Sequence, residues 1–250
     1  MDPVAIDRFG AAVAAAEEAL AWRELEPLYC EGDARGFFDE DRIEHMRDTA
    51  LAVSSDLAEL YERQAKQERP ARRTLFIGAA VAELWIVLFE RIVLKRRYAW
   101  VNLPGVEARA LDAALAAAEP HAGTDLPRLK TAAWNRAEIG PVDHLWLCSV
   151  LTDPERFPAL HDELYGRIGS PEAIGGGHPK RERGFARDLV LRSFECLGTE
   201  GLVTTTDEEL AVLRPLAREV DATLDAPQHG QTSALVGDVL RHCAWRRVRS

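Results

Sequence analysis

The sequence has only four lysines against 27 arginines, and its two asparagines are Asn102 and Asn135. This bias is typical of GC-rich bacterial genomes, so we expect a bacterial source. The four cysteines form no Cys-x-x-Cys pair, which excludes the usual zinc-knuckle and dithiol redox motifs. The longest apolar stretch, residues 75–95, is interrupted by Glu83 and Glu90. It is too short and too charged for a membrane span, so no membrane partner is expected.

The composition describes a globular protein with a sizeable core. Of the 250 residues, 47% are hydrophobic and 29% are charged, and the formal net charge is −10. A chain of this length folds as one or two domains without needing a metal or disulfides, and disordered and fibrous classes are excluded. The acidic balance argues against a nucleic-acid partner. The first 16 residues lack a basic region followed by an apolar core, which predicts a cytoplasmic protein.

The hydrophobic pattern predicts an all-α fold. Apolar residues recur at spacings of three and four, and alternating β-branched runs are nearly absent. We expect an irregular bundle of about nine helices around a central apolar helix at residues 75–95. Residues 1–168 would form the main helical domain, and residues 169–250 a helical subdomain or a continuation of the same domain.

Local signals place several elements within this pattern. Helices are expected at residues 141–151 and 232–245, and the stretch LVTTT at residues 202–206 is expected to be extended. Thr206 and Glu209 have the spacing of a capping box, in which the side chain of the first residue accepts the amide of the fourth. A helix is therefore predicted to begin at Thr206 and to reach about residue 224.

The segment GGGHPKRER, residues 175–183, is the clearest candidate for a ligand site. Helix N-termini favour acidic residues because the helix dipole is positive there, yet basic residues begin this helix. A bound anion would relieve that conflict, held by glycine amides, the helix end and the basic side chains. The predicted anion-binding residues are Gly175, Gly176, Gly177, His178, Lys180, Arg181 and Arg183. The alternative is a flexible glycine linker whose basic residues pair with acidic helices.

The charge distribution suggests a second surface. Residues 1–70 hold 17 acidic and 8 basic residues, a net charge of −9. An acidic helical face can simply be solvated, or it can bind a basic partner. Glu40, Asp41 and Glu44 are the candidates for contact with such a protein.

Two further constellations have weaker support. Asp-x3-His occurs at Asp41 and His45 and again at Asp238 and His242, a spacing that helical metal oxidases use together with glutamates. No Glu-x-x-His is present, so arginine pairing of Glu83 and Glu90 is expected instead, and no metal or other cofactor is assigned. Arg156 and His161 have the Arg-x4-His spacing of HEPN-type ribonucleases, which arises easily by chance in an arginine-rich chain.

These observations lead to a hypothesis of a non-enzymatic cytoplasmic helical protein. It would be an adaptor or immunity-type protein that engages a basic protein through its acidic N-terminal face. The alternatives are an enzyme or sensor for a phosphorylated or other anionic small ligand at residues 175–183, a HEPN-like ribonuclease, or a helical metal-dependent oxidase. No convincing catalytic set is present, so whether the protein is an enzyme stays open.

Overall fold

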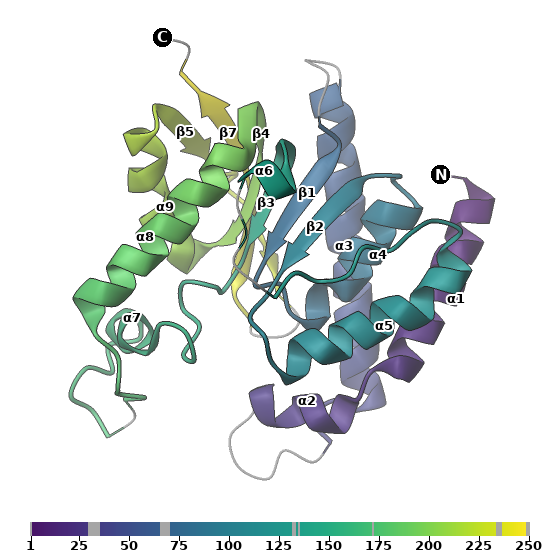
Figure 1. Ribbon diagram of the computed structural model, residues 1–250, viewed down its shortest axis with the longest axis horizontal. Helices are drawn as coiled ribbons and strands as arrows, with labels where there is room; N and C mark the ends of the chain where they lie inside the picture. The colour runs from purple at the N-terminus through teal and green to yellow at the C-terminus, as the bar shows by residue number, and fades with distance from the viewer. Residues whose placement is uncertain are drawn as a thin grey trace. The chain divides into compact units, whose positions relative to one another are not determined.

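The computed structural model describes residues 2–29, 36–65, 71–131, 134, 136–171, 173–233 and 237–248. Helices and strands are interspersed along the chain (Figure 1). The helices are α1 (Pro3–Ala19), α2 (Trp22–Tyr29), α3 (Glu40–Ala65), the short 3-10 turn η1 (Val81–Glu83), α4 (Leu84–Ile92), α5 (Val106–Ala122), α6 (Arg136–Ile139), α7 (Pro158–Leu164), α8 (Pro179–Cys196) and α9 (Asp207–Glu219). The strands are β1 (Arg73–Ile77), β2 (Arg97–Val101), β3 (Val142–Leu147), β4 (Leu197–Thr206), β5 (Ala222–Asp225), β6 (Gln231–Thr232) and β7 (Val239–Arg247). The predicted all-α fold is therefore wrong, and the fold is mixed α/β.

The strands form one sheet in the order β2-β1-β3-β4-β7-β5, and β6 pairs with β7. β3 and β4 are parallel, with Trp146 opposite Thr204, whereas β7 runs antiparallel to β4, β5 and β6. In open α/β sheets, ligands bind outside the carboxyl ends of parallel strands.

The chain divides into two compact units. Unit 1 comprises residues 1–74, 79–133 and 233–237, and unit 2 comprises residues 75–78, 134–232 and 238–250. Residues 169–250, expected as a subdomain, thus fall in unit 2 together with residues 134–168, apart from residues 233–237.

Unit 1 contains a buried ionic network around Glu90. Phe9 of α1 meets Phe89 of α4 edge to face with ring centroids 5.4 Å apart, which places α4 in the core. The Glu90 carboxylate accepts hydrogen bonds from the hydroxyls of Tyr61 and Thr74. It also lies 3.7 Å from the Arg96 guanidinium. The predicted arginine pairing of Glu90 is confirmed.

In unit 2, helices α8 and α9 pack on β3, β4 and β7. Phe194 of α8 contacts Trp245 of β7, with ring centroids 4.7 Å apart. A polar network runs across neighbouring strands, in which the Thr204 hydroxyl lies 2.8 Å from both His144 Nε2 and His242 Nδ1. Strand pairing aligns Thr204 with His242, and a fixed register keeps this network together.

Three predicted helices prove to be wholly or partly strands. Residues 75–95 contain the end of β1, then a turn and the shorter helix α4. Residues 141–151 contain β3, and residues 232–245 contain most of β7. A strand buried on both faces reads as a continuous apolar run, which periodicity cannot distinguish from a buried helix. The prediction that residues 202–206 are extended is confirmed, because they form the end of β4.

Two further observations concern membranes and cysteines. Across the described part of the chain, no helix combines the length and the apolar character that a bilayer crossing needs. Cys148, Cys196 and Cys243 are buried free thiols. Cys30 lies outside the described residues.

The burial of His242 predicts a specific loss of stability in acid. Burial and the nearby His144 lower the pKa of His242 to about 4, from an ordinary value of 6.5. The unfolded chain therefore binds a proton between about pH 6.5 and pH 4 that the folded chain does not. The contribution of His242 to the free energy of unfolding is complete above pH 6.5. It decreases as the pH falls and is about 2 kcal/mol smaller at pH 5.

Urea unfolding of the wild type and of His242→Asn at pH 7 and pH 5 tests this prediction. The wild type should lose about 2 kcal/mol more than the variant over this interval. Equal losses in the two proteins would show that His242 does not control this acid sensitivity.

Candidate functional site

The loop that follows β3 is held by a buried carboxylate from α9. Glu209 accepts hydrogen bonds from the backbone amides of Ser149 and Leu151, at 3.0 and 2.6 Å, and from the Thr205 hydroxyl at 3.2 Å. Burial raises the pKa of Glu209 to about 7, although these hydrogen bonds favour the ionised form. Ser149 has a φ of +56°, a conformation that is costly for a residue with a Cβ, so Glu209 stabilises a strained turn.

The same loop contacts the end of β1. A Cβ on Gly78, which has a φ of +63°, would lie 2.7 Å from a methyl group of Val150. The segments that follow β1 and β3 therefore lie against each other. The Ser149 hydroxyl donates to Asp238 at 2.8 Å and ties the loop to the residue before β7.

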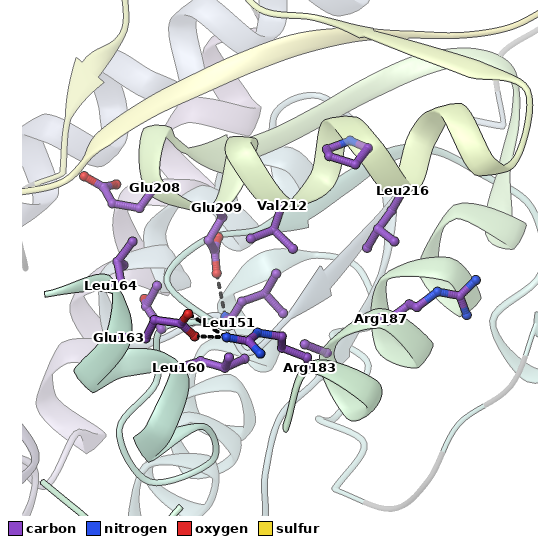
Figure 2. Close-up of a pocket in the computed structure, with 13 residues that line it drawn as sticks. Leu151, Leu160, Glu163, Leu164, Arg183, Arg187, Glu208, Glu209, Val212 and Leu216 are labelled. Carbon is purple, nitrogen blue, oxygen red and sulfur yellow. Dashed lines mark hydrogen bonds and ion pairs between the residues drawn. The ribbon is translucent and has the colours of Figure 1, made fainter. Parts of the chain in front are cut away.

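A pocket of about 480 Å³ opens beside this loop, within unit 2 (Figure 2). Its walls come from the loop after β3 and from α7, α8 and α9. They are mostly apolar: Leu151, Thr152, Leu160, Glu163, Leu164, Arg183, Ala186, Arg187, Glu208, Glu209, Val212, Pro215 and Leu216. The pocket lies at the carboxyl ends of β3 and β4, which are neighbouring parallel strands. Its volume and apolar lining are typical of a small-molecule site.

Most charged groups of the pocket are already compensated. Arg183 forms an ion pair with Glu163 at 2.5 Å, which Figure 2 shows as dashed lines. Arg187 pairs with Glu219 on α9. Glu208 differs, because its Oε2 atom is buried and has no hydrogen-bond partner among the described residues.

Unit 1 has its own group of polar residues after β1 and β2. The Ala80 amide donates to Glu83 at 2.7 Å, and the Val81 amide donates to Glu107 at 3.1 Å. At the end of β2, Asn102 donates from its side-chain amide to the Ala79 carbonyl oxygen. The loop after β1 is thus bordered by the carboxylates of Glu83 and of Glu107 on α5, and by the Asn102 carboxamide after β2.

The glycine-rich loop predicted to bind an anion is pinned by carboxylates of the chain itself. Asp162 accepts the amides of Ile174 and Gly175 at 2.9 and 3.0 Å. Glu182 accepts the amides of Ala159, Leu160 and His178 at 2.8–3.0 Å. The first turn of α8 therefore includes a buried acid among its basic residues.

The structure places the predicted anion-binding residues in different surroundings. Gly175, Gly176, Gly177, His178, Lys180 and Arg181 are exposed, and the Arg181 guanidinium lies over the Phe185 ring at 5.4 Å. Arg183 belongs to the pocket wall through its pair with Glu163. Anion binding by these residues stays a prediction, and Gly175 already donates its amide to Asp162.

The packing of Gly177 predicts a sharp response to one added methyl group. A Cβ there would lie 2.2 Å from a Glu182 carboxylate oxygen and 2.5 Å from the Ala159 amide nitrogen. We expect Gly177→Ala to lower the free energy of unfolding by about 1–3 kcal/mol. Gly184→Ala is the matched control, because a Cβ at this helical position meets open space and should stabilise by up to about 1 kcal/mol. Urea denaturation measures both, and equal effects would contradict the close packing at Gly177.

The other predicted residues do not converge. Glu40, Asp41, Glu44 and His45 are exposed on α3. Asp238 pairs with Ser149, whereas His242 joins the Thr204 network. Within the described residues, no group of three or more histidines, cysteines or acids could hold a metal ion.

Arg156 and His161 also have separate contacts. The Arg156 guanidinium lies over the Phe157 and Phe185 rings, at 5.9 and 5.6 Å. The His161 Nδ1 atom lies 2.8 Å from the Thr152 carbonyl oxygen, and its ring packs on Tyr165. Each side chain therefore has a local structural role.

Sequence reasoning missed the pocket and its acids. The Thr206-x-x-Glu209 pattern was the one available signal, and Thr206 does accept the Glu209 amide at 3.3 Å. However, the Glu209 side chain reaches the loop after β3, which no local pattern indicates. Glu208 lies in the acidic first turn of α9, a position usually explained by the helix dipole.

Comparisons with known proteins give structural similarity only. No protein-family model matches the chain, and no curated protein does. Three solved structures are similar at low identity. PH0851 is 11% identical with a TM-score of 0.47, and the match covers 82% of this chain and 46% of that chain. The 16S rRNA methylase RmtB is 12% identical with a TM-score of 0.40, and the match covers 82% of this chain and 75% of that chain. The mitomycin 7-O-methyltransferase MmcR is 12% identical with a TM-score of 0.44, and the match covers 99% of this chain and 69% of that chain. The chain thus spans less than half of the PH0851 chain.

The observed fold corrects the functional hypothesis from sequence. The helical adaptor is wrong, because the chain contains a mixed sheet. The basic protein partner belonged to that hypothesis and is withdrawn with it, and the expectation that nucleic acid is not a partner is not carried further. The helical ribonuclease and the helical oxidase are corrected by the same mixed sheet, and the anionic-ligand enzyme is not proposed again.

Proposed function

We propose that this chain is an enzyme that transfers a methyl group from S-adenosylmethionine to a small acceptor. One observation carries the proposal: an apolar pocket within unit 2 at the carboxyl ends of the parallel strands β3 and β4. Methyl transfer is the reaction named for RmtB and MmcR, and we take it as the reaction to test. A cytoplasmic location stays a prediction.

The residues of unit 1 after β1 and β2 fit such a cofactor in chemical type. S-adenosylmethionine carries a sulfonium, an ammonium group and two ribose hydroxyls, which need negative charge and neutral hydrogen-bonding groups. Glu83 and Glu107 supply negative charge beside the loop after β1. Asn102 uses one amide hydrogen on Ala79 and one oxygen lone pair on the Leu103 amide, so its side chain keeps a donor and an acceptor.

Each part of the chain then has a defined task. When bound, S-adenosylmethionine supplies an electrophilic methyl group. Asn102 would hold the ribose hydroxyls, and the carboxylates of Glu83 and Glu107 would attract the cationic groups. The pocket walls in unit 2 would exclude water from the acceptor, and Glu209 would keep the loop after β3 in its strained conformation.

Labelled methyl transfer tests the proposal. The purified protein is incubated with methyl-tritiated S-adenosylmethionine and a set of small phenols and amines, and label is counted in the extracted products. We expect transfer by the wild type and its loss in Val212→Trp, because the indole would fill the pocket. Ala211→Trp is the control, since Ala211 is exposed on α9 and does not line the pocket. Equal activity in both variants would show that the acceptor does not use this pocket.

A further inference from the structure

The charges around the pocket are balanced except at one end. Glu163 is paired with Arg183, and Arg187 is paired with Glu219. The Glu209 carboxylate is bound by two backbone amides and a hydroxyl. Glu208 also lines the pocket, and its buried Oε2 atom meets no hydrogen-bond donor in the described part of the chain. A buried carboxylate oxygen without a donor is costly, so this atom marks a place for a ligand donor.

Neighbouring groups make this end of the pocket negative. Asp238, near Glu208, has its pKa raised first by burial and further by the negative charge of Glu208. Burial also raises the pKa of Tyr165, and the charges of Asp238 and Glu208 add to that effect. Figure 2 shows Glu208 at the opposite end of the pocket from Arg187. The field at Glu208 therefore favours a cation.

The rest of the pocket requires an apolar body. Leu151, Leu160, Val212 and Leu216 contribute hydrocarbon walls, and Val212 and Leu164 are 44% and 43% exposed. An aromatic or branched aliphatic ligand would cover these side chains and gain their hydrophobic contribution. A volume of about 480 Å³ accommodates a molecule of more than one ring.

We propose that the pocket of unit 2 binds a small apolar molecule with one protonated amine, whose ammonium group donates to the Glu208 carboxylate. We identify this ligand as the methyl acceptor, and that identification alone rests on the proposed function. An anionic ligand is disfavoured at Glu208 by the same negative field. A neutral ligand would leave the buried Oε2 atom without a charged donor.

Three probes of the same shape separate these possibilities: 4-phenylbutylamine, 4-phenyl-1-butanol and 4-phenylbutyrate. Calorimetry at pH 7.5 without S-adenosylmethionine gives their dissociation constants for the wild type, Glu208→Gln and Glu200→Gln. We expect the amine to bind at least about tenfold more tightly than the alcohol or the acid. Glu208→Gln should weaken the amine about tenfold and leave the alcohol unchanged. Glu200 is exposed and outside the pocket, so Glu200→Gln is the control with the same change in net charge.

Several results would overturn the proposal. The proposal fails if the amine and the alcohol bind equally, if 4-phenylbutyrate binds more tightly than the amine, or if no probe binds. It also fails if Glu208→Gln and Glu200→Gln weaken amine binding equally. Val212→Trp should abolish amine binding, and retained binding would place the amine elsewhere. Thermal unfolding confirms that each variant is folded. The binding measurement contains no S-adenosylmethionine, so it is independent of methyl transfer. Amine binding without methyl transfer would overturn only the proposed function. Methyl transfer to other acceptors without amine binding would overturn only this inference.

Discussion

Replacing Glu209 by alanine is expected to lower the free energy of unfolding by about 3–5 kcal/mol. The carboxylate is buried and accepts the amides of Ser149 and Leu151 and the hydroxyl of Thr205. Its removal leaves these donors without an acceptor and releases the strained turn at Ser149. Urea denaturation at pH 7 measures the effect.

Glu208→Ala is the matched control, because it removes the adjacent carboxylate of the same helical turn. Its buried oxygen has no donor within the described chain and is costly to bury, so its removal should leave the free energy of unfolding unchanged or raise it by up to about 1 kcal/mol. The free energy of unfolding of Glu209→Gln should lie between those of Glu208→Ala and Glu209→Ala. The glutamine side chain can accept one of the hydrogen bonds, but its own N–H group opposes a second. Equal stabilities of Glu208→Ala and Glu209→Ala would contradict the role of Glu209 as the anchor of this loop.

Arg96→Met is expected to destabilise the chain by about 3–5 kcal/mol, because it leaves the buried Glu90 carboxylate without its cation. Both side chains are almost fully buried, and the Arg96 guanidinium also lies 3.6 Å from the centre of the Tyr61 ring. The double variant Glu90→Gln/Arg96→Met should recover much of the loss, since no buried charge remains. Thermal and urea unfolding report both values.

Arg97→Met provides the comparison for Arg96. Arg97 is exposed and its side chain donates to the Ala71 carbonyl oxygen, so its replacement should cost less than about 1 kcal/mol. If the double variant were no more stable than Arg96→Met, burial of the Glu90 charge would not explain the effect.

The amphipathic helices could be predicted from sequence, whereas most strands could not. Helices α1, α3 and α9 are partly exposed, so their apolar residues recur with the helical period. Every residue of β3 is buried, which removes the alternation that marks a strand. The end of β4 was recognisable because valine and three threonines follow one another there.

The candidate site depends on contacts between residues far apart in the chain. Glu209 contacts Ser149 and Leu151, which lie about 60 residues earlier in the sequence. Asp238 contacts Ser149 across a separation of 89 residues. Nothing near Glu209 in the sequence distinguishes it from an ordinary residue in the acidic first turn of a helix. The exposed loop 175–183 had the clearer local pattern, yet its geometry is set by the buried carboxylates of Asp162 and Glu182.

Binding of S-adenosylmethionine is the most direct test of the central claim. Calorimetric titration of the folded protein should show one site, with affinity reduced about tenfold in Asn102→Ala and unchanged in Ser55→Ala, an exposed position on α3. Absence of binding of both S-adenosylmethionine and S-adenosylhomocysteine at concentrations up to about 1 mM would contradict the claim that this chain is a methyltransferase.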